Sequence, residues 1–248
     1  NNRIFDYFST GSQSNGKGVL AFTGSSAWTI TNNRIFHTAT RRWSTGGSGT
    51  FENIYNCIQV EAGSGYLISD NVLGFANASG TGFTIIVPNG FPGNNYASMI
   101  QAIIFNPSTG TASTISNNTI AGFDLTSSRS KTSAGENIFF GIYITGATSS
   151  RVVVSGNTIG SPSSTGSIVI RSTAITIAGF TVPAAAIYMR QNSASTHSIS
   201  GNSIGGISMI FSSPGVALMD KTAFYGIYFD NAGQTTVDNN TIGGSVAN

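Results

Sequence analysis

The chain has 248 residues and a formal net charge of +2, and only 8% of its residues are charged, against about 25% in an average soluble domain. Its 11 basic residues are scattered singly apart from Arg41-Arg42, so the sequence lacks the basic stripe of a nucleic-acid-binding protein. The 40% apolar content is placed periodically, which argues against disorder. No apolar run approaches the ~20 residues that cross a bilayer.

The chain opens on Asn1-Asn2-Arg3-Ile4-Phe5, and residues 29–36 carry the same five residues after Thr-Ile-Thr. Related copies of this motif return at residues 67–74, 114–121, 153–160, 198–205 and 236–243. A motif that recurs every ~40 residues is typical of a solenoid, in which each repeat stacks on the one before it.

Every full copy contains an asparagine with an Ile or Val three residues before it and an Ile or Leu two residues after it. The residue just before the asparagine is Asn, Asp or Gly, the types that enter a left-handed backbone conformation at least cost. The pattern predicts a bend between two strands whose apolar side chains point inward. Stacking of the repeats then predicts a ladder of amide hydrogen bonds. Its members are Asn33, Asn71, Asn118, Asn157, Asn202 and Asn240.

A second strand is expected ahead of each motif, and the interval between asparagines alternates between shorter and longer values. The second strands are predicted at residues 19–22, 57–60, 102–105, 141–144, 186–189 and 226–229. The longer repeats add the alternating runs 83–87 and 168–177, which we expect to form a third sheet with a projecting hairpin or flap. Each repeat is either one enlarged coil or two plain coils, and one coil is favoured.

These motifs resemble the right-handed parallel β-helix family, which includes pectate-lyase-like enzymes, phage tailspikes and many bacterial surface proteins. The resemblance implies an all-β solenoid with an asparagine ladder and alternating short and long loop excursions, forming a single domain over residues 1–248. The chain starts inside one copy of the motif and stops just after another. We expect an excerpt of a longer or polymerising molecule, with neighbouring segments or subunits stacked at both ends; a proteolytic or engineered fragment is the alternative.

Candidate catalytic residues are few. Glu52 and Glu136 occupy the same position two repeats apart, about 9.6 Å at one coil per repeat, which borders on the spacing of an inverting glycosidase pair. Duplication of a structural glutamate is the favoured interpretation. His37 and His197 lack a neighbouring carboxylate in sequence and are expected to be solvated loop residues. Cys57 is expected to be a small core residue, and neither a metal nor a cofactor is predicted.

Three tyrosines form a more specific pattern. If the isoleucine before each points inward, Tyr143, Tyr188 and Tyr228 stack on the outer face of consecutive coils. An exposed row is suited to binding sugar rings or a neighbouring subunit, but burial beneath a long-repeat excursion is favoured. Arg190 and Asp230 lie two residues further along and are expected to form a cross-strand ion pair.

The functional expectation is a non-enzymatic, extracellular structural or adhesive module of a bacterial cell-surface protein, stalk or fibre. Low charge, Ser/Thr/Asn richness and the absence of a catalytic cluster favour it. The alternatives are a polysaccharide-degrading β-helix enzyme or tailspike depolymerase, and a carbohydrate-binding module that holds surface glycans on the tyrosine row. The matched motif is structural and does not decide among them.

Overall fold

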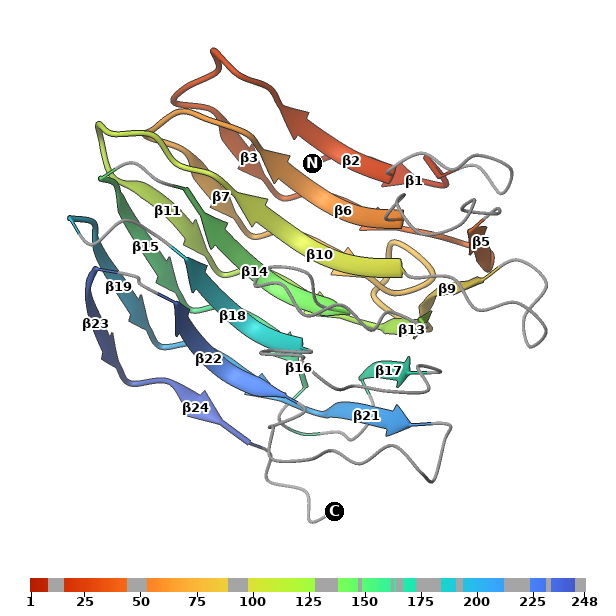
Figure 1. Cartoon of the computed structure of the whole chain (residues 1–248). Helices are drawn as coiled ribbons and strands as arrows, with labels where there is room; N and C mark the ends of the chain where they lie inside the picture. Colours follow the sequence, from red (N-terminus) through yellow and green to blue (C-terminus); the bar gives the residue numbers. More distant parts are fainter. Residues whose placement is uncertain are drawn as a thin grey trace.

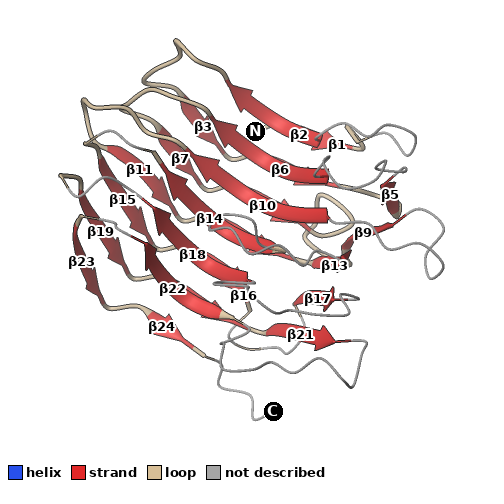
Figure 2. Ribbon diagram, viewed as in Figure 1, coloured by secondary structure: helices blue, strands red, loops and turns tan. Residues whose placement is uncertain are grey.

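The computed structural model describes residues 1–8, 16–43, 53–88, 98–127, 138–146, 149–161, 163, 167–172, 184–190, 194–211, 224–230 and 233–243. Within these ranges every regular element is a β-strand and none is a helix (Figure 2). The strand pairs are parallel, and the strands of each sheet follow one another along the stack, from red to blue in Figure 1. The described fold is therefore all-β and built from parallel sheets.

The strands form four sheets. Sheet A, which follows the ladder asparagines, contains β1 (Arg3–Phe5), β4 (Arg34–Phe36), β8 (Val72–Gly74), β12 (Thr119–Ala121), β16 (Thr158–Gly160), β20 (Ser203–Gly205) and β24 (Thr241–Ile242). Sheet B contains β2 (Gly16–Ala21), β6 (Asn53–Val60), β10 (Ser98–Phe105), β14 (Phe139–Thr145), β18 (Ala184–Arg190) and β22 (Tyr225–Asp230). Sheet C contains β3 (Thr29–Thr31), β7 (Leu67–Ser69), β11 (Ser113–Ser116), β15 (Arg151–Ser155), β19 (Thr196–Ser200) and β23 (Gln234–Asp238). Sheet D contains β5 (Arg41–Trp43), β9 (Thr84–Pro88), β13 (Phe123–Ser127), β17 (Ile168–Ser172) and β21 (Ile207–Phe211).

Each repeat passes once through the four sheets in the order B, C, A, D. Strands β2, β3, β4 and β5 belong to four different sheets, and β6 returns to sheet B beside β2. One repeat is therefore one coil, as favoured from the sequence. This arrangement fits a parallel β-helix.

The predicted ladder is present and continuous. Successive ladder asparagines are 38, 47, 39, 45 and 38 residues apart, and each joins the next by a side-chain hydrogen bond of 2.8–2.9 Å. The series extends to Asn2, whose Nδ2 donates to Asn33 Oδ1 at 3.0 Å. Asn71, Asn118 and Asn157 are at most 1% exposed, and these bonds supply the partners that buried amides need.

The predicted bends also have the expected backbone conformation. The residue before each ladder asparagine has a φ angle between 53° and 64°. These residues are Asn32, Asp70, Asn117, Gly156, Gly201 and Asn239. The left-handed conformation turns the chain from sheet C into sheet A and keeps the ladder amide inside.

The sequence-based assignment of the third sheet to the longer repeats is wrong. Sheet D contains β9 and β17 from the longer repeats, but also β5, β13 and β21 from the shorter ones. Part of the length difference lies between sheets A and D, where Gly122 alone separates β12 from β13 and residues 75–83 separate β8 from β9. The rest of the predicted excursions, at 44–52, 89–97, 128–137, 173–183 and 212–223, falls outside the described residues.

The core is a column of inward side chains from consecutive coils. Ile58, Ile103, Ile142 and Ile187 lie in register on sheet B and are completely buried. Full burial of one such side chain contributes roughly 1.5–3 kcal/mol. Cys57 is also fully buried, as predicted, and burial raises its pKa to about 12.

Candidate functional site

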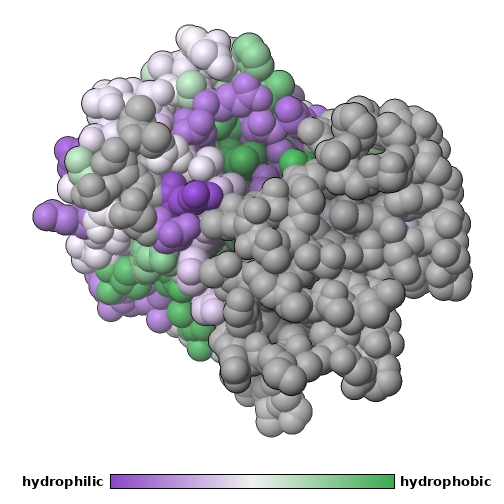
Figure 3. Space-filling view, viewed as in Figure 1, coloured by the Kyte–Doolittle hydropathy of each residue, from purple (hydrophilic) through white to green (hydrophobic). Residues whose placement is uncertain are grey.

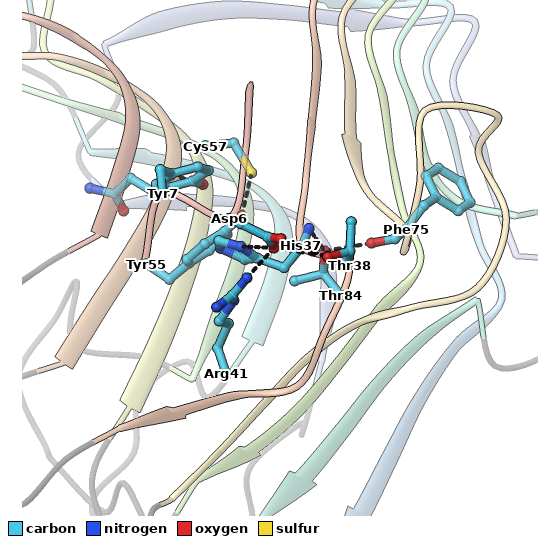
Figure 4. A network of polar contacts seen from close by, with 10 residues as sticks. Asp6, Tyr7, His37, Thr38, Arg41, Tyr55, Cys57, Phe75 and Thr84 are labelled. Carbon is cyan, nitrogen blue, oxygen red and sulfur yellow. Dashed lines mark hydrogen bonds and ion pairs between the residues drawn. The ribbon is translucent and has the colours of Figure 1, made fainter. Parts of the chain in front are cut away.

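A polar cluster joins the first two coils at the residues that come directly after strands β1 and β4 (Figure 4). Strands β1 and β4 pair in register, with Phe5 beside Phe36. The next residues, Asp6 and His37, are therefore brought together although they are distant in sequence. Asp6 has a φ angle of 53°, so the chain turns at this point.

The carboxylate of Asp6 holds three groups of the following coil. It accepts hydrogen bonds from Thr38 N at 3.0 Å and Thr38 Oγ1 at 2.6 Å, and it forms an ion pair with Arg41. Burial alone would raise its pKa, but the contacts with Thr38 and Arg41 outweigh burial and lower the pKa to about 2. Asp6 is therefore ionised at neutral pH and its oxygens are occupied.

The ring of His37 lies inside the coil, against two tyrosines. Its centroid is 4.8 Å from that of Tyr7 and 5.3 Å from that of Tyr55. Its Nδ1 is 3.5 Å from Asp6 Oδ1, but neither ring nitrogen has a hydrogen-bond partner among the residues that the structure describes. Burial, together with Arg41, lowers the pKa of His37 to about 4, and Asp6 only partly offsets this. The ring is neutral at pH 7.

Both histidine predictions are wrong. His37 is fully buried and His197, inside β19, is 6% exposed, so neither is a solvated loop residue. Burial also lowers the pKa of His197 to about 4. The carboxylate near His37 was missed because Asp6 is 31 residues away in the sequence. It lies beside His37 only because two copies of the motif stack.

The chemistry open to this cluster is limited. Burial raises the pKa of the Cys57 thiol and of Tyr7 and Tyr55, so these groups stay protonated at neutral pH. The Cys57 thiol donates to Tyr55 Oη at 3.7 Å, and Tyr7 Oη donates to the Asn56 carbonyl at 3.3 Å. The backbone N–H of His37 donates to Thr84 Oγ1 at 3.1 Å, which ties the cluster to the next coil. The arrangement is suited to fastening coils together.

The predicted tyrosine row is stacked as expected. Ring centroids are 5.1 Å apart for Tyr143 and Tyr188 and 5.3 Å apart for Tyr188 and Tyr228. Tyr143 is 7% exposed and Tyr188 is 1% exposed, so both rings are buried, and Tyr228 is partly buried. The parts of the long-repeat excursions at 89–97 and 173–183, one of which was expected to cover the row, lie outside the described residues. Phe140 and Ala185 complete this second apolar cluster.

The ion pair beside the tyrosine row is also confirmed. Arg190 Nε lies 3.5 Å from Asp230 Oδ2, and Tyr188 Oη donates to the same oxygen at 3.0 Å. Figure 3, viewed from the side of sheet B, shows polar and apolar residues interspersed over the described part of that face.

The two glutamates singled out from the sequence, Glu52 and Glu136, lie outside the described residues. Among those described, no three His, Cys, Asp or Glu side chains gather in a way that could hold a metal ion. The same part of the chain contains no helix long and apolar enough to cross a membrane. No protein-family model, no curated protein and no solved structure matches this chain.

Proposed function

We propose that this chain is a structural, non-enzymatic segment of a right-handed parallel β-helix, a building block of a stalk or fibre in an extracellular bacterial surface protein. The observation that carries the proposal is the continuity of the asparagine ladder, in which each link from Asn2 to Asn240 repeats the same donor and acceptor. Because the same hydrogen bonds join each coil to the next, further coils can lengthen the stack without a different kind of contact between them.

The geometry of the rungs supports a role in resisting tension along the stacking axis. Each coil contributes a rung of about 4.8 Å, and its hydrogen bonds to the neighbouring coils run along the stacking axis. Amides in the ladder also bond to the backbone of the previous coil, as Asn157 Nδ2 does to Ile115 O at 2.9 Å. Side-chain and backbone bonds therefore resist separation of the same two coils. We propose that further coils, in the same or another chain, stack at both ends.

A polysaccharide-degrading enzyme is the competing function. Such an enzyme needs a carboxyl group that reaches substrate. Asp6 is held by Thr38 and Arg41, and Asp124 by Arg171 through bonds of 3.0 and 3.1 Å. Because these two carboxylates are paired within the scaffold, neither is free to act on a substrate, and this favours the structural role.

Electron microscopy of the native molecule tests the proposal, combined with a screen for cleavage of soluble polysaccharides. We expect a rod in which these coils continue into neighbouring density, and no release of reducing ends or unsaturated sugars. An isolated compact particle that cleaves a polysaccharide would overturn the structural role and favour the enzyme. Protease shaving of intact cells would test the surface location separately.

A further inference from the structure

The outer face of sheet C carries the same kind of side chain at the same position in successive coils. Along β11, β15 and β19 the inward residues Ile115, Val154 and Ile199 are completely buried, so the residues on either side of each point outward. We call these outward residues the hydroxyl face, because five of the six carry a hydroxyl group and none is charged or aromatic. They are Thr114, Ser116, Val153, Ser155, Ser198 and Ser200.

The side chains of the hydroxyl face form a regular lattice. Ser116 pairs in register with Ser155, and Ser155 with Ser200. Neighbouring strands are about 4.8 Å apart, and two residues along a strand span about 6.6–6.8 Å. The strands of sheet C lie side by side along the stack (Figure 1). Two residues separate each strand of sheet C from the next strand of sheet A in every coil, so no excursion interrupts the lattice at this border.

The hydroxyl groups of this face are not used by the fold. Ser116, Ser155 and Ser200 are partly exposed. Among the residues that the structure describes, no hydroxyl group of the hydroxyl face has a hydrogen-bond partner. Serine is also not among the residue types that are enriched in strands. Neither strand propensity nor an internal hydrogen bond therefore explains a serine at the same position of three successive coils.

The lattice limits what can bind the hydroxyl face. A ligand that contacts several coils at once must itself repeat at about 4.8 Å. Sugar polymers are held by aromatic rings, which these six positions lack. A second copy of the chain repeats at the same spacing, but the centres of stable protein interfaces are rich in aromatic residues and depleted in serine. An ice crystal repeats in two directions, is uncharged, and presents oxygen atoms that donate and accept hydrogen bonds.

We propose that the hydroxyl face binds the surface of an ice crystal. Oxygen atoms on the prism faces of ice repeat at spacings close to those of the lattice in both directions. Waters held on the serine hydroxyls of successive coils therefore join the crystal in its own register, and such bridging waters bind nearly as well as direct contacts. The methyl groups of Thr114 and Val153 lie between these hydroxyls and add apolar contact with the crystal.

Rigidity makes many weak contacts effective. The asparagine ladder fixes the bend directly after Ser116 and Ser155, through Asn118 and Asn157. The rows of the hydroxyl face are therefore ordered before they meet ice, and a preorganised surface loses less entropy on binding. This ligand goes beyond the proposed structural role and requires only the stack of coils.

Capture by growing ice tests the proposal with the intact protein. Ice is grown slowly on a cold surface from a dilute solution that also contains serum albumin, and the fraction of each protein in the ice is measured. Thermal hysteresis is measured on the same samples. The variants are Ser155→Tyr and Ser116→Tyr. Ser208→Tyr is the matched control, because Ser208 is partly exposed on β21 of sheet D. Circular dichroism at the capture temperature shows whether each variant is folded.

We expect the protein to enter the ice while albumin is excluded, and to produce thermal hysteresis. Ser155→Tyr and Ser116→Tyr should each lose most of both activities, because a projecting ring holds the crystal away from the adjacent coils. Ser208→Tyr should retain them.

Three results would overturn the proposal. One is exclusion of the unmodified protein from ice together with albumin, and another is equal capture of folded Ser155→Tyr and Ser208→Tyr. The third is a dimer in sedimentation velocity that Ser155→Tyr abolishes, which would assign the hydroxyl face to a second copy of the chain. The rod expected in electron microscopy is independent of all three, so the structural role is judged separately.

Discussion

Asn157 and Asn202 are joined twice. The backbone N–H and the side-chain Nδ2 of Asn157 both donate to Oδ1 of Asn202, each at 2.9 Å. One amide oxygen thus holds both the backbone at the bend and the asparagine side chain of the preceding coil. Because the same pair of bonds joins every neighbouring pair of ladder asparagines, the ladder couples local backbone conformation to stacking.

The variant Asn157→Leu should therefore be strongly destabilised. It removes the acceptor of Asn118 N and Nδ2 and the donor to Ile115 O. Each buried polar group left unpaired costs about 1–3 kcal/mol. We expect a large drop in melting temperature relative to Ser198→Ala, a change at a partly exposed position of β19. Equal shifts in the two variants would contradict a stabilising ladder.

The ladder and the inward rows could be predicted from the sequence because their periodicity repeats at every level. Asn118 and Ile115 are recognisable in any copy of the motif. The contact between Asp6 and His37 was missed because it depends on stacking of two copies that differ after the shared Asn-Asn-Arg-Ile-Phe. Aligning the two copies places Asp6 and His37 at the same position, directly after the shared phenylalanine. The contact could therefore have been predicted from the alignment of the copies. Among the strands of sheet D in the shorter repeats, β5 has only three residues, two of them arginines, and β13 offers only two apolar residues, so neither contains a long apolar run. β21 is as long as β9 and β17 and mostly apolar, so its signal was present in the sequence.

Two left-handed glycines, one in β16 of sheet A and one in the loop between β8 and β9, offer a matched test of close packing. Gly160 and Gly80 have φ angles of 75° and 76°, but an added Cβ at Gly160 would collide with the carbonyl of Gly205, whereas at Gly80 it meets nothing within 4 Å. Gly80→Ala should cost about 1–2 kcal/mol from backbone conformation alone. Gly160→Ala should cost clearly more in denaturant unfolding, because it also separates β16 from β20. Equal costs would show that the coils can move apart there.

The stability of the protein should fall in mild acid. The pKa of His37 and of His197 is lowered from 6.5 to about 4 by burial, so the unfolded chain binds protons that the folded chain does not. Their contribution is fully present above pH 6.5 and is lost as the pH falls towards 4, at up to about 1.4 kcal/mol per pH unit for each ring. Urea unfolding at pH 7, 6, 5 and 4.5 measures this slope.

A histidine variant separates the two contributions. His37→Phe keeps an aromatic ring between Tyr7 and Tyr55 but cannot take up a proton, so roughly half of the slope between pH 6.5 and 4.5 should disappear. An unchanged slope would show that His37 titrates normally in the folded protein.

The Asp6 carboxylate should hold the first coil in place. Asp6→Asn removes the charge that pairs with Arg41 and weakens the two hydrogen bonds from Thr38. Breaking a partly buried pair leaves Arg41 without its counter-charge, so we expect faster hydrogen exchange in β1 and β4 and little change in β16 and β20. The variant should also lower the pKa of His37 further, because Asp6 raises that pKa while Arg41 lowers it. Asp70→Asn, at an exposed bend of the same end, is the control. Identical exchange rates in the two variants would mean that the cluster does not fasten the first coil.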